Sequence, residues 1–418
     1  MKRRLPLGIQ DFAKIREGGY CYVDKTARIH DLLTGSGSQF FLSRPRRFGK
    51  SLLCSTLGVI FEGKRELFSG LAIDSLDWEW KKRPVIRFDL NPGDYVRGIN
   101  ELFATINMAL DLCAEKYGVP CEGETISAQF TRLIYKLWEK FGEKVVVVID
   151  EYDKPLLSTI DHKELHETMR SALKGFYSVL KSSDAYLEFV FLTGVTKFAQ
   201  VSVFSDLNHL TDLSLDPPYS DLCGITQEEL EQDFAPEIDE IIQNGTRDRE
   251  RYLAELKRFY NGYRFSRKPV TVYNPFGLLN HFDKGGDFLP YWFETGTPAF
   301  LIKLIEKQNI DIVNLGKLTV RYDDFRKYDG ENMEAVPVLY QSGYLTIAGY
   351  NEERNIFSLD YPNEEVRGSF AESLIEKYLR VPGQNLHAFI VRFSNAIYDG
   401  DVDGILNNRY VEECGNIT

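Results

Sequence analysis

Hydrophobic and polar positions recur with clear periods along the first half of the chain. Apolar side chains return every three or four residues between 126 and 141, which predicts an amphipathic helix that ends at Gly142. Five consecutive β-branched residues follow at 145–149, a pattern typical of a strand buried on both faces of a sheet. Three further apolar runs predict strands at residues 39–43, 84–90 and 188–194. Strands that alternate with long helices indicate an α/β fold with a parallel sheet.

The pattern changes after residue 216. The stretch 216–224 contains two prolines and ends at a glycine, which indicates a boundary. Helical periods dominate beyond it, in residues 226–234, 247–263 and 298–307. A helix at 336–343 and two strands around the turn "NEER" then predict a winged-helix-like unit. We expect an α/β domain, a helical and winged-helix-like domain, and a helical tail, at residues 1–220, 221–370 and 371–418.

The composition narrows the class of protein. The chain has 418 residues and a formal net charge of -12, which disfavours non-specific coating of nucleic acid. Its six cysteines form no CxxC pair, as is usual in a reducing compartment. No apolar run reaches the roughly 18 residues of a membrane span, and the basic start lacks the apolar core of a signal peptide. We expect a cytoplasmic protein without a membrane partner.

The clearest chemical motif is "RPRRFGKS", residues 44–51. A Walker A loop has a glycine, four residues, Gly-Lys, and Ser or Thr; Gly49, Lys50 and Ser51 fit, and Arg44 stands at the first glycine. Backbone N–H groups in such a turn bind phosphate oxygens, the lysine binds the outer phosphates, and the serine hydroxyl binds Mg²⁺. The residues expected to bind the nucleotide are Arg44, Arg46, Arg47, Phe48, Gly49, Lys50, Ser51 and Leu52.

Two carboxylates directly follow the buried strand, at the end where open α/β sheets bind their ligands. As in a Walker B motif, we expect Asp150 to hold Mg²⁺, mostly through water, and Glu151 to orient and deprotonate the attacking water. Thr193 ends the neighbouring predicted strand, and its hydroxyl either senses the γ-phosphate or caps the strand end. The expected catalytic residues are therefore Glu151, Lys50 and Thr193, and the expected metal ligands are Ser51 and Asp150.

Arg44 departs from the Walker A pattern, and Pro45 restricts it to extended backbone. Two roles remain open for the three arginines of the loop. One of them contacts the triphosphate or acts as an arginine finger in cis, since a guanidinium matches phosphate bidentately. Alternatively, they pair with carboxylates such as Asp89 or Asp153.

Longer strings extend these motifs over nearly the whole chain. They are "YVDKT", "FLSRPRRFGKSLL", "VVVVIDEYDKP", "LTGVTKFAQVSVFSDLNHLTDLSL", "YNGYRF", "VYNPFGLL", "WFETGTPAFL", "LYQSGYLTI" and "YPNEEVRGSF". Together they resemble the bacterial AAA-ATPase-like proteins that often carry a C-terminal PD-(D/E)XK nuclease domain. In that family "RPRRFGKS" is the usual form of the loop. The resemblance implies ATP and Mg²⁺ as ligands of a P-loop NTPase of the additional-strand, catalytic-glutamate type, followed by a helical and winged-helix-like region.

The family's nuclease would follow residue 370 and needs a (D/E)-x-K pair. After residue 371 the only lysine is Lys377, and Ile375 stands two positions before it, so this pair cannot form. The 48 residues of 371–418 are also too few for a nuclease fold. We expect no nuclease activity from this chain.

These observations predict a Mg²⁺-dependent module that binds and hydrolyses ATP and acts as a nucleotide switch for a C-terminal effector. The alternative is an ATP-binding scaffold or regulatory interaction domain without turnover. The expected partners are ATP and either another protein or a second copy of the chain. Direct DNA binding is disfavoured because residues 321–370 hold ten acidic and five basic side chains, whereas DNA affinity depends on neutralising phosphates.

Overall fold

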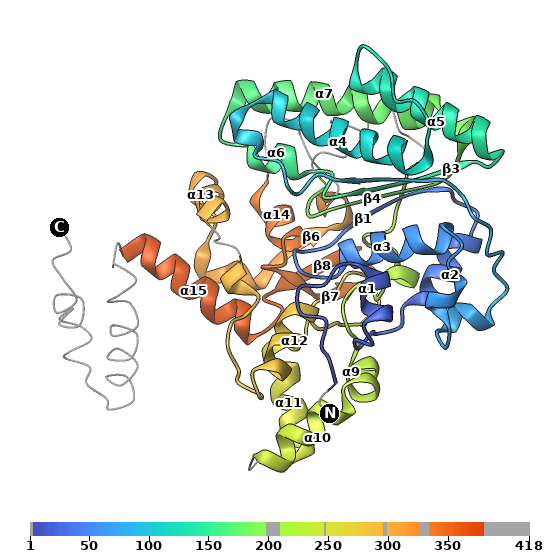
Figure 1. The fold of residues 1–418 in the computed structure, drawn as a ribbon. Helices are drawn as coiled ribbons and strands as arrows, with labels where there is room; N and C mark the ends of the chain where they lie inside the picture. The colour runs from blue at the N-terminus through green and yellow to red at the C-terminus, as the bar shows by residue number, and fades with distance from the viewer. Residues whose placement is uncertain (1–2, 198–209, 246–247, 296–298, 326–333, 380–418) are drawn as a thin grey trace, which may run out of the picture.

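A computed structural model describes residues 3–197, 210–245, 248–295, 299–325 and 334–379. Its main element is a five-stranded parallel sheet with the spatial order β2-β3-β4-β1-β5 (Figure 1). The strands are β1 (Gln39–Ser43), β2 (Val85–Asp89), β3 (Val145–Asp150), β4 (Leu187–Gly194) and β5 (Thr211–Asp212). The predicted parallel α/β sheet is confirmed, and β5 was not predicted because a two-residue strand has no apolar period.

One face of this sheet is covered by a layer of long helices (Figure 1). The helices of this layer are α4 (Ile99–Tyr117), α5 (Ile126–Phe141) and α7 (Lys163–Ser182), with the short α6 (Lys154–Ser158) beside them. The bounds of α5 match the predicted helix. It ends because Gly142 adopts a left-handed conformation with φ 66° and donates its N–H to Trp138 O.

The other face carries the helix that follows the Gly-Lys-Ser turn. This face of the sheet is covered by three helices: α3 (Lys50–Phe61), which follows that turn, α1 (Phe12–Glu17) and α2 (Thr26–Thr34). The apolar core on this face continues without a break into the second half of the chain, as far as Leu374. The two halves therefore share one core on the side where α3 begins.

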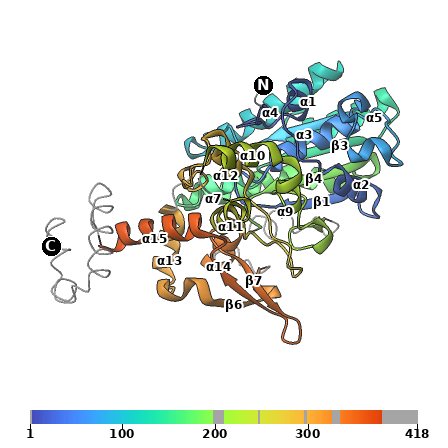
Figure 2. The ribbon, with the colours of Figure 1, turned by 90° about the horizontal axis from the view of Figure 1, so that it is seen from below.

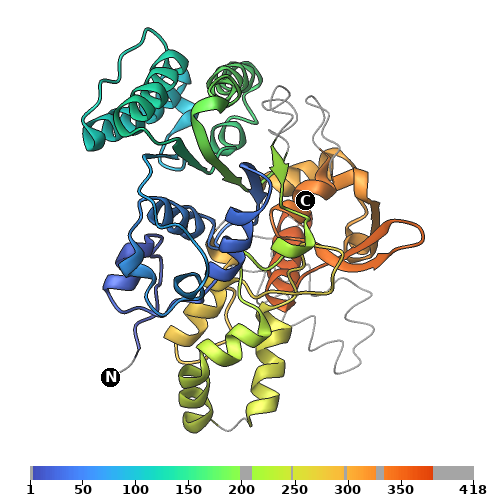
Figure 3. The same ribbon diagram turned by 90° about the vertical axis from the view of Figure 1, so that its right-hand side faces the viewer.

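The second half is mainly helical. It contains α9 (Gln227–Asp233), α10 (Ala235–Asn244), α11 (Arg249–Tyr260), α12 (Pro275–Asp283), α13 (Ala299–Lys307), α14 (Ala335–Gln341) and α15 (Glu364–Leu379). In Figure 3 the yellow-green helices lie at the lower end of the molecule, and an orange-red hairpin projects at the right. The hairpin predicted after residue 343 is confirmed. No helix in the described part of the chain is long and apolar enough to cross a membrane.

The hairpin belongs to a small antiparallel sheet with the order β6-β8-β7 (Figure 2). Its strands are β6 (Leu318–Arg321), β7 (Thr346–Asn351) and β8 (Ile356–Asp360). Sequence patterns missed β6 because only four residues form it and half of them are exposed. The winged-helix likeness and the boundaries at residues 220 and 370 remain predictions, and most of the expected tail, from residue 380 onward, lies outside the described residues.

A buried carboxyl near the start of α15 makes stability depend on pH. Glu365 is 1% exposed. Burial raises its pKa to about 8 from an ordinary 4.5, although N–H groups of Trp292 and Phe293 act in the opposite direction. Between these two values the folded chain holds a proton on Glu365 that the unfolded chain releases.

Rising pH in this window should therefore lower the free energy of unfolding. We expect the wild type to lose roughly 2–4 kcal/mol relative to Glu365→Gln between pH 5 and pH 8, with no further change from this group above pH 8. Urea denaturation across this range measures both proteins. Parallel pH profiles would contradict the assignment.

Candidate functional site

The Gly-Lys-Ser turn lies where β1 ends and α3 begins. Arg44 continues β1 by donating its backbone N–H to Gly194 O at 3.2 Å. The chain then turns through two left-handed residues, Arg47 with φ 66° and Gly49 with φ 90°. Glycine adopts this conformation without strain, whereas a side chain with a Cβ resists it. The loop therefore stores backbone strain directly before the first turn of α3, as functional loops often do.

Lys50 is the most constrained cation of the site. Its side chain is 3% exposed, and its Nζ lies 3.2 Å from each of Arg44 O, Pro45 O and Glu151 Oε1. Burial acts to lower the pKa of Lys50, but the nearby carboxylates, Glu151 foremost, outweigh it and raise the pKa. Lys50 is thus charged, and it is paired with Glu151, the carboxylate that sequence analysis predicts to be the general base.

The carboxyl ends of β3 and β4 join through a short hydrogen bond. Thr193 Oγ1 donates to Asp150 Oδ1 at 2.6 Å, and Glu151 N donates to the same oxygen at 3.1 Å. Glu151 itself adopts a left-handed backbone with φ 53°. This arrangement orients the Asp150 carboxyl and turns the chain sharply at Glu151. A strained non-glycine residue of this kind points to a functional position.

Asp153 ties the loop after β3 to the segment after β4. Its fully buried carboxylate accepts hydrogen bonds from Val195 N, Thr196 N and Thr196 Oγ1 at 2.7–3.2 Å. Burial, followed by the charge of Glu151, raises the pKa of Asp153 to about 6. A Cβ at Gly194 would lie 2.4 Å from Asp153 Oδ1, so this tie requires glycine there. Asp153 therefore pairs with main chain and hydroxyl groups rather than with an arginine of the loop.

The guanidinium of Arg44 lies among main-chain carbonyls. It donates to Ser43 O, Ser214 O and Tyr219 O at 2.8–3.0 Å and stacks 4.2 Å from the ring centroid of Phe265. Its exposed fraction is 1%. Neither Asp89 nor Asp153 forms an ion pair with it, so the structure gives Arg44 a third role, which sequence analysis had not considered.

The other loop residues divide between the core and the surface. Phe48 is buried in edge-to-face contact with Tyr263 and Phe265, so its side chain lies in the core. Arg46 and Arg47 are exposed, and the Arg47 guanidinium lies 5.0 Å from the ring centroid of Phe276.

A cavity of about 310 Å³ opens in front of the loop, and we call it the charged cavity. Charged side chains from both sides line it: Arg46, Arg47, Lys50, Asp89, Glu151 and Lys154. Ser51 and Leu52 also reach it. Asp150 lies in an adjoining cavity of about 260 Å³ that shares Ser51 and Asp89 with the first. The expected phosphate and metal ligands therefore line two adjoining cavities, whereas the side chains of Arg44 and Phe48 line neither.

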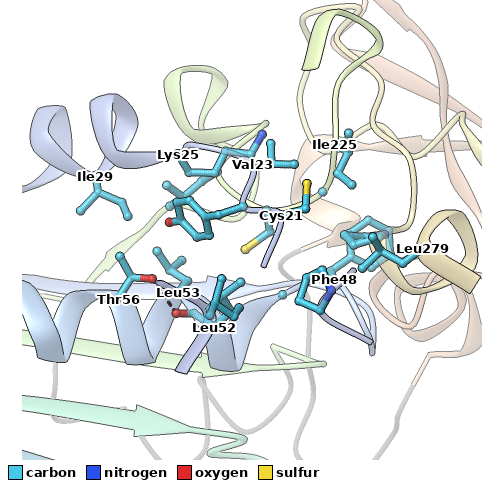
Figure 4. A pocket seen from close by; sticks show the side chains of 18 of the residues that line it. Cys21, Val23, Lys25, Ile29, Phe48, Leu52, Leu53, Thr56, Ile225 and Leu279 are labelled. Carbon is cyan, nitrogen blue, oxygen red and sulfur yellow. Dashed lines mark hydrogen bonds between the residues drawn. The ribbon is translucent and has the colours of Figure 1, made fainter. Parts of the chain in front are cut away.

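A second, apolar cavity of about 110 Å³ lies beside α3 (Figure 4). Cys21 and Val23 line it from the N-terminal segment, Leu53 lines it from α3, and Ile225 and Leu279 line it from the second half of the chain. Gly49 and Leu52 border both this apolar cavity and the charged cavity. A ligand with an anionic end and a flat apolar end could occupy both.

The acidic groups around Asp150 fit a divalent cation. Burial raises the pKa of Asp89, and the charges of Asp150 and Glu151 act in the same direction, whereas the N–H of Asn91 and the charge of Arg87 oppose them. Among the described residues no cluster of three metal-ligating side chains occurs. Mg²⁺ is commonly bound by one or two protein groups together with phosphate oxygens and water. Ser51 and Asp150 could supply those protein groups.

Sequence analysis missed the residues that reach the loop from the second half. Trp292 Nε1 donates to Arg46 O at 3.0 Å, and a Cβ at Gly343 would lie 2.9 Å from Pro45. Both residues occur in strings quoted above, "WFETG" and "LYQSG", yet no local pattern links them to a loop some 250–300 positions earlier.

Comparison with known proteins agrees with this geometry. A family model described as "Predicted AAA-ATPase" matches residues 6–204, the part that contains the loop and strands β1 to β4. A protein of Azotobacter chroococcum mcd 1, described as "Uncharacterized protein in vnfD 5'region", is 39% identical over 402 residues, which are 95% of this chain and 74% of that protein. The similarity to that protein thus extends through the second half of the chain.

Arg44→Met tests whether this guanidinium stabilises the fold or binds phosphate. Three buried carbonyls would lose a charged donor, so we expect the free energy of unfolding to fall by roughly 2 kcal/mol. The affinity of the folded variant for ATP should stay within about twofold. Arg46→Met, at an exposed position, is the matched control for stability and should leave the free energy of unfolding unchanged. An ATP affinity that falls more than tenfold with unchanged stability would make Arg44 a phosphate ligand.

Proposed function

Since the chain belongs to the AAA-ATPase-like family, we propose that it binds ATP with Mg²⁺, hydrolyses it and acts as a nucleotide-driven switch for an effector. One observation carries the proposal. Lys50, Ser51 and Glu151 line one cavity with the strained loop, and Asp150 lines the hollow that adjoins it. The strand order supports the additional-strand, catalytic-glutamate type, because β4 lies between the loop strand β1 and the Asp-Glu strand β3.

In this proposal each residue has one task. The backbone N–H groups of residues 49–51 and Lys50 Nζ bind the outer phosphates. Ser51 and Asp150 hold Mg²⁺, which neutralises phosphate charge when it is bound. Thr193 acts through its 2.6 Å hydrogen bond, which keeps the Asp150 carboxyl in one orientation.

Glu151 has the task of the general base. A phosphate that attracts Lys50 would separate Nζ from Glu151 Oε1, which lie 3.2 Å apart in the structure. The carboxylate would then be free to accept a proton from the attacking water. The same ion pair favours the alternative function as well, because a Glu151 that stays paired gives an ATP-binding scaffold without turnover.

The apolar cavity is the proposed site of the adenine base. It borders the charged cavity at Gly49 and Leu52, so a single nucleotide can reach both. Its walls come from the N-terminal segment, α3 and the second half of the chain (Figure 4). A bound base would therefore touch both halves, which supports a switch whose halves respond to nucleotide.

The small sheet and α14 are proposed to form a winged-helix-like unit that contacts a protein. β8 lies between β6 and β7, and α14 directly precedes β7. The acidic balance of residues 321–370 disfavours nucleic acid as the partner. Another protein or a second copy of the chain remains the proposed partner.

Two substitutions separate ATP binding from turnover. Lys50→Ala should raise the Kd for ATP about thirtyfold, since a charge-assisted contact is worth roughly 2 kcal/mol. Glu151→Gln should keep the affinity and lower phosphate release by roughly 100-fold or more. Lys136→Ala, on the outer face of α5, is the control. Calorimetry with ATP and Mg²⁺ and a phosphate-release assay measure the two quantities.

The outcomes of this experiment discriminate the candidates. Binding without turnover in the wild type would select the scaffold function. No ATP binding by the wild type would reject the proposal as a whole.

A separate substitution tests the site of the base. Leu52→Ala should weaken ATP binding by roughly 1–2 kcal/mol, because apolar area that packs on the base is lost. Binding of inorganic tripolyphosphate should be unaffected, since it lacks a base. Leu112→Ala, an exposed position on α4, is the matched control. Equal losses for the two ligands would mean that the base lies outside the apolar cavity.

A further inference from the structure

Trp292 connects the phosphate-binding loop with helix α15. Its indole Nε1 donates to Arg46 O at 3.0 Å, and its backbone N–H donates to Glu365 Oε1 at 2.7 Å. Trp292 is 5% exposed and Glu365 is 1% exposed, so solvent competes little for either bond. Glu365 is the second residue of α15. A continuous path of two hydrogen bonds therefore runs from the loop to the helix.

The surroundings hold this path in one geometry. The Trp292 ring packs with Tyr263 at 6.1 Å and with Tyr344 at 5.6 Å between centroids, and Tyr263 also meets Phe48 of the loop at 4.8 Å. Gly343 approaches Pro45 so closely that no side chain fits between them. Because close-packed groups of this kind move together, a shift of residues 45–48 would displace Trp292.

The bond to Arg46 O also orients the loop. The peptide group that joins Arg46 and Arg47 is planar and trans, so its C=O and N–H point in opposite directions. When Trp292 holds Arg46 O, the Arg47 N–H must point to the side of the loop away from Trp292. Arg47 lies in the charged cavity with its backbone in the left-handed region. An N–H fixed in this way is a ready donor to a phosphate oxygen.

We propose that Trp292 is a positioning residue for the phosphate-binding loop, and that Glu365 couples it to α15, so that nucleotide binding and the order of α15 depend on each other. This inference rests on the proposed function, since it needs a nucleotide at the loop. Coupling between two sites is reciprocal. A partner that binds α15 would therefore change the affinity of the loop for nucleotide by a certain factor. Nucleotide would change the affinity of the chain for that partner by the same factor.

Trp292→Phe removes the indole N–H and keeps an aromatic ring. One lost hydrogen bond corresponds to about a fivefold rise in the Kd for ATP. Amide hydrogen exchange of residues 364–379 should slow when ATP and Mg²⁺ are added to the wild type and should not respond in the variant. Trp78→Phe is the matched control, because Trp78 Nε1 is buried and has no hydrogen-bond partner among the described residues.

A second pair of variants keeps the test decisive if Trp292→Phe does not fold. Glu365→Leu removes the acceptor of the Trp292 N–H, whereas Glu365→Gln keeps one. The exchange response of α15 to ATP should vanish in Glu365→Leu and persist in Glu365→Gln. Thermal unfolding by circular dichroism shows which variants are folded at the temperature of the measurement.

The outcomes separate this inference from the function on which it rests. A wild type that does not bind ATP in calorimetry overturns both. A wild type that binds ATP while exchange in α15 stays unchanged, or variants that respond as the wild type does, overturn the coupling alone. Loss of the α15 response with ATP binding retained within about tenfold supports it.

Discussion

The buried guanidinium of Arg44 is the contact on which the arrangement of loop, sheet and second half depends. It holds carbonyls from the end of β1 and from residues 214 and 219, and its planar face covers Phe265. A buried charge is costly unless its hydrogen bonds are made. Here carbonyl dipoles and an aromatic face supply that compensation, and no described carboxylate forms an ion pair with it. Arg44, at the first position of the loop, therefore joins the two halves of the chain.

A loop anchored in this way can store strain. Arg47 and Glu151 both adopt left-handed backbones, and each lies in the charged cavity. Such conformations persist only when their neighbours are fixed on both sides. In the loop, the buried Phe48 fixes the residue next to Arg47. After β3, the hydrogen bond from Tyr152 N to Thr193 O, at 2.9 Å, fixes the residue next to Glu151. The rigid frame thus places the Lys50 and Glu151 side chains opposite each other.

Residues of the second half of the chain form hydrogen bonds with the site itself. Trp292 bonds the loop, and Gln341 Oε1 accepts the N–H of Lys197 at 2.9 Å, just beyond β4. The phosphate-binding loop and the segment just beyond β4 are therefore both in contact with residues far along the chain. Interfaces between packed elements tend to have discrete arrangements. The proposed coupling therefore predicts that nucleotide at the loop biases the position of α14 and α15.

The sequence by itself determined the elements whose causes are local. The apolar stripe of α5, the β-branched run of β3, and the Gly-Lys-Ser and Asp-Glu motifs follow from side-chain periodicity and backbone preference over a few residues. Only the tertiary structure decided the strand order, the direction of the Arg44 guanidinium and the bond between Trp292 and Arg46, which lie 246 positions apart. A long polar side chain has many partners of similar energy, and packing selects among them, so no local pattern could have identified these contacts.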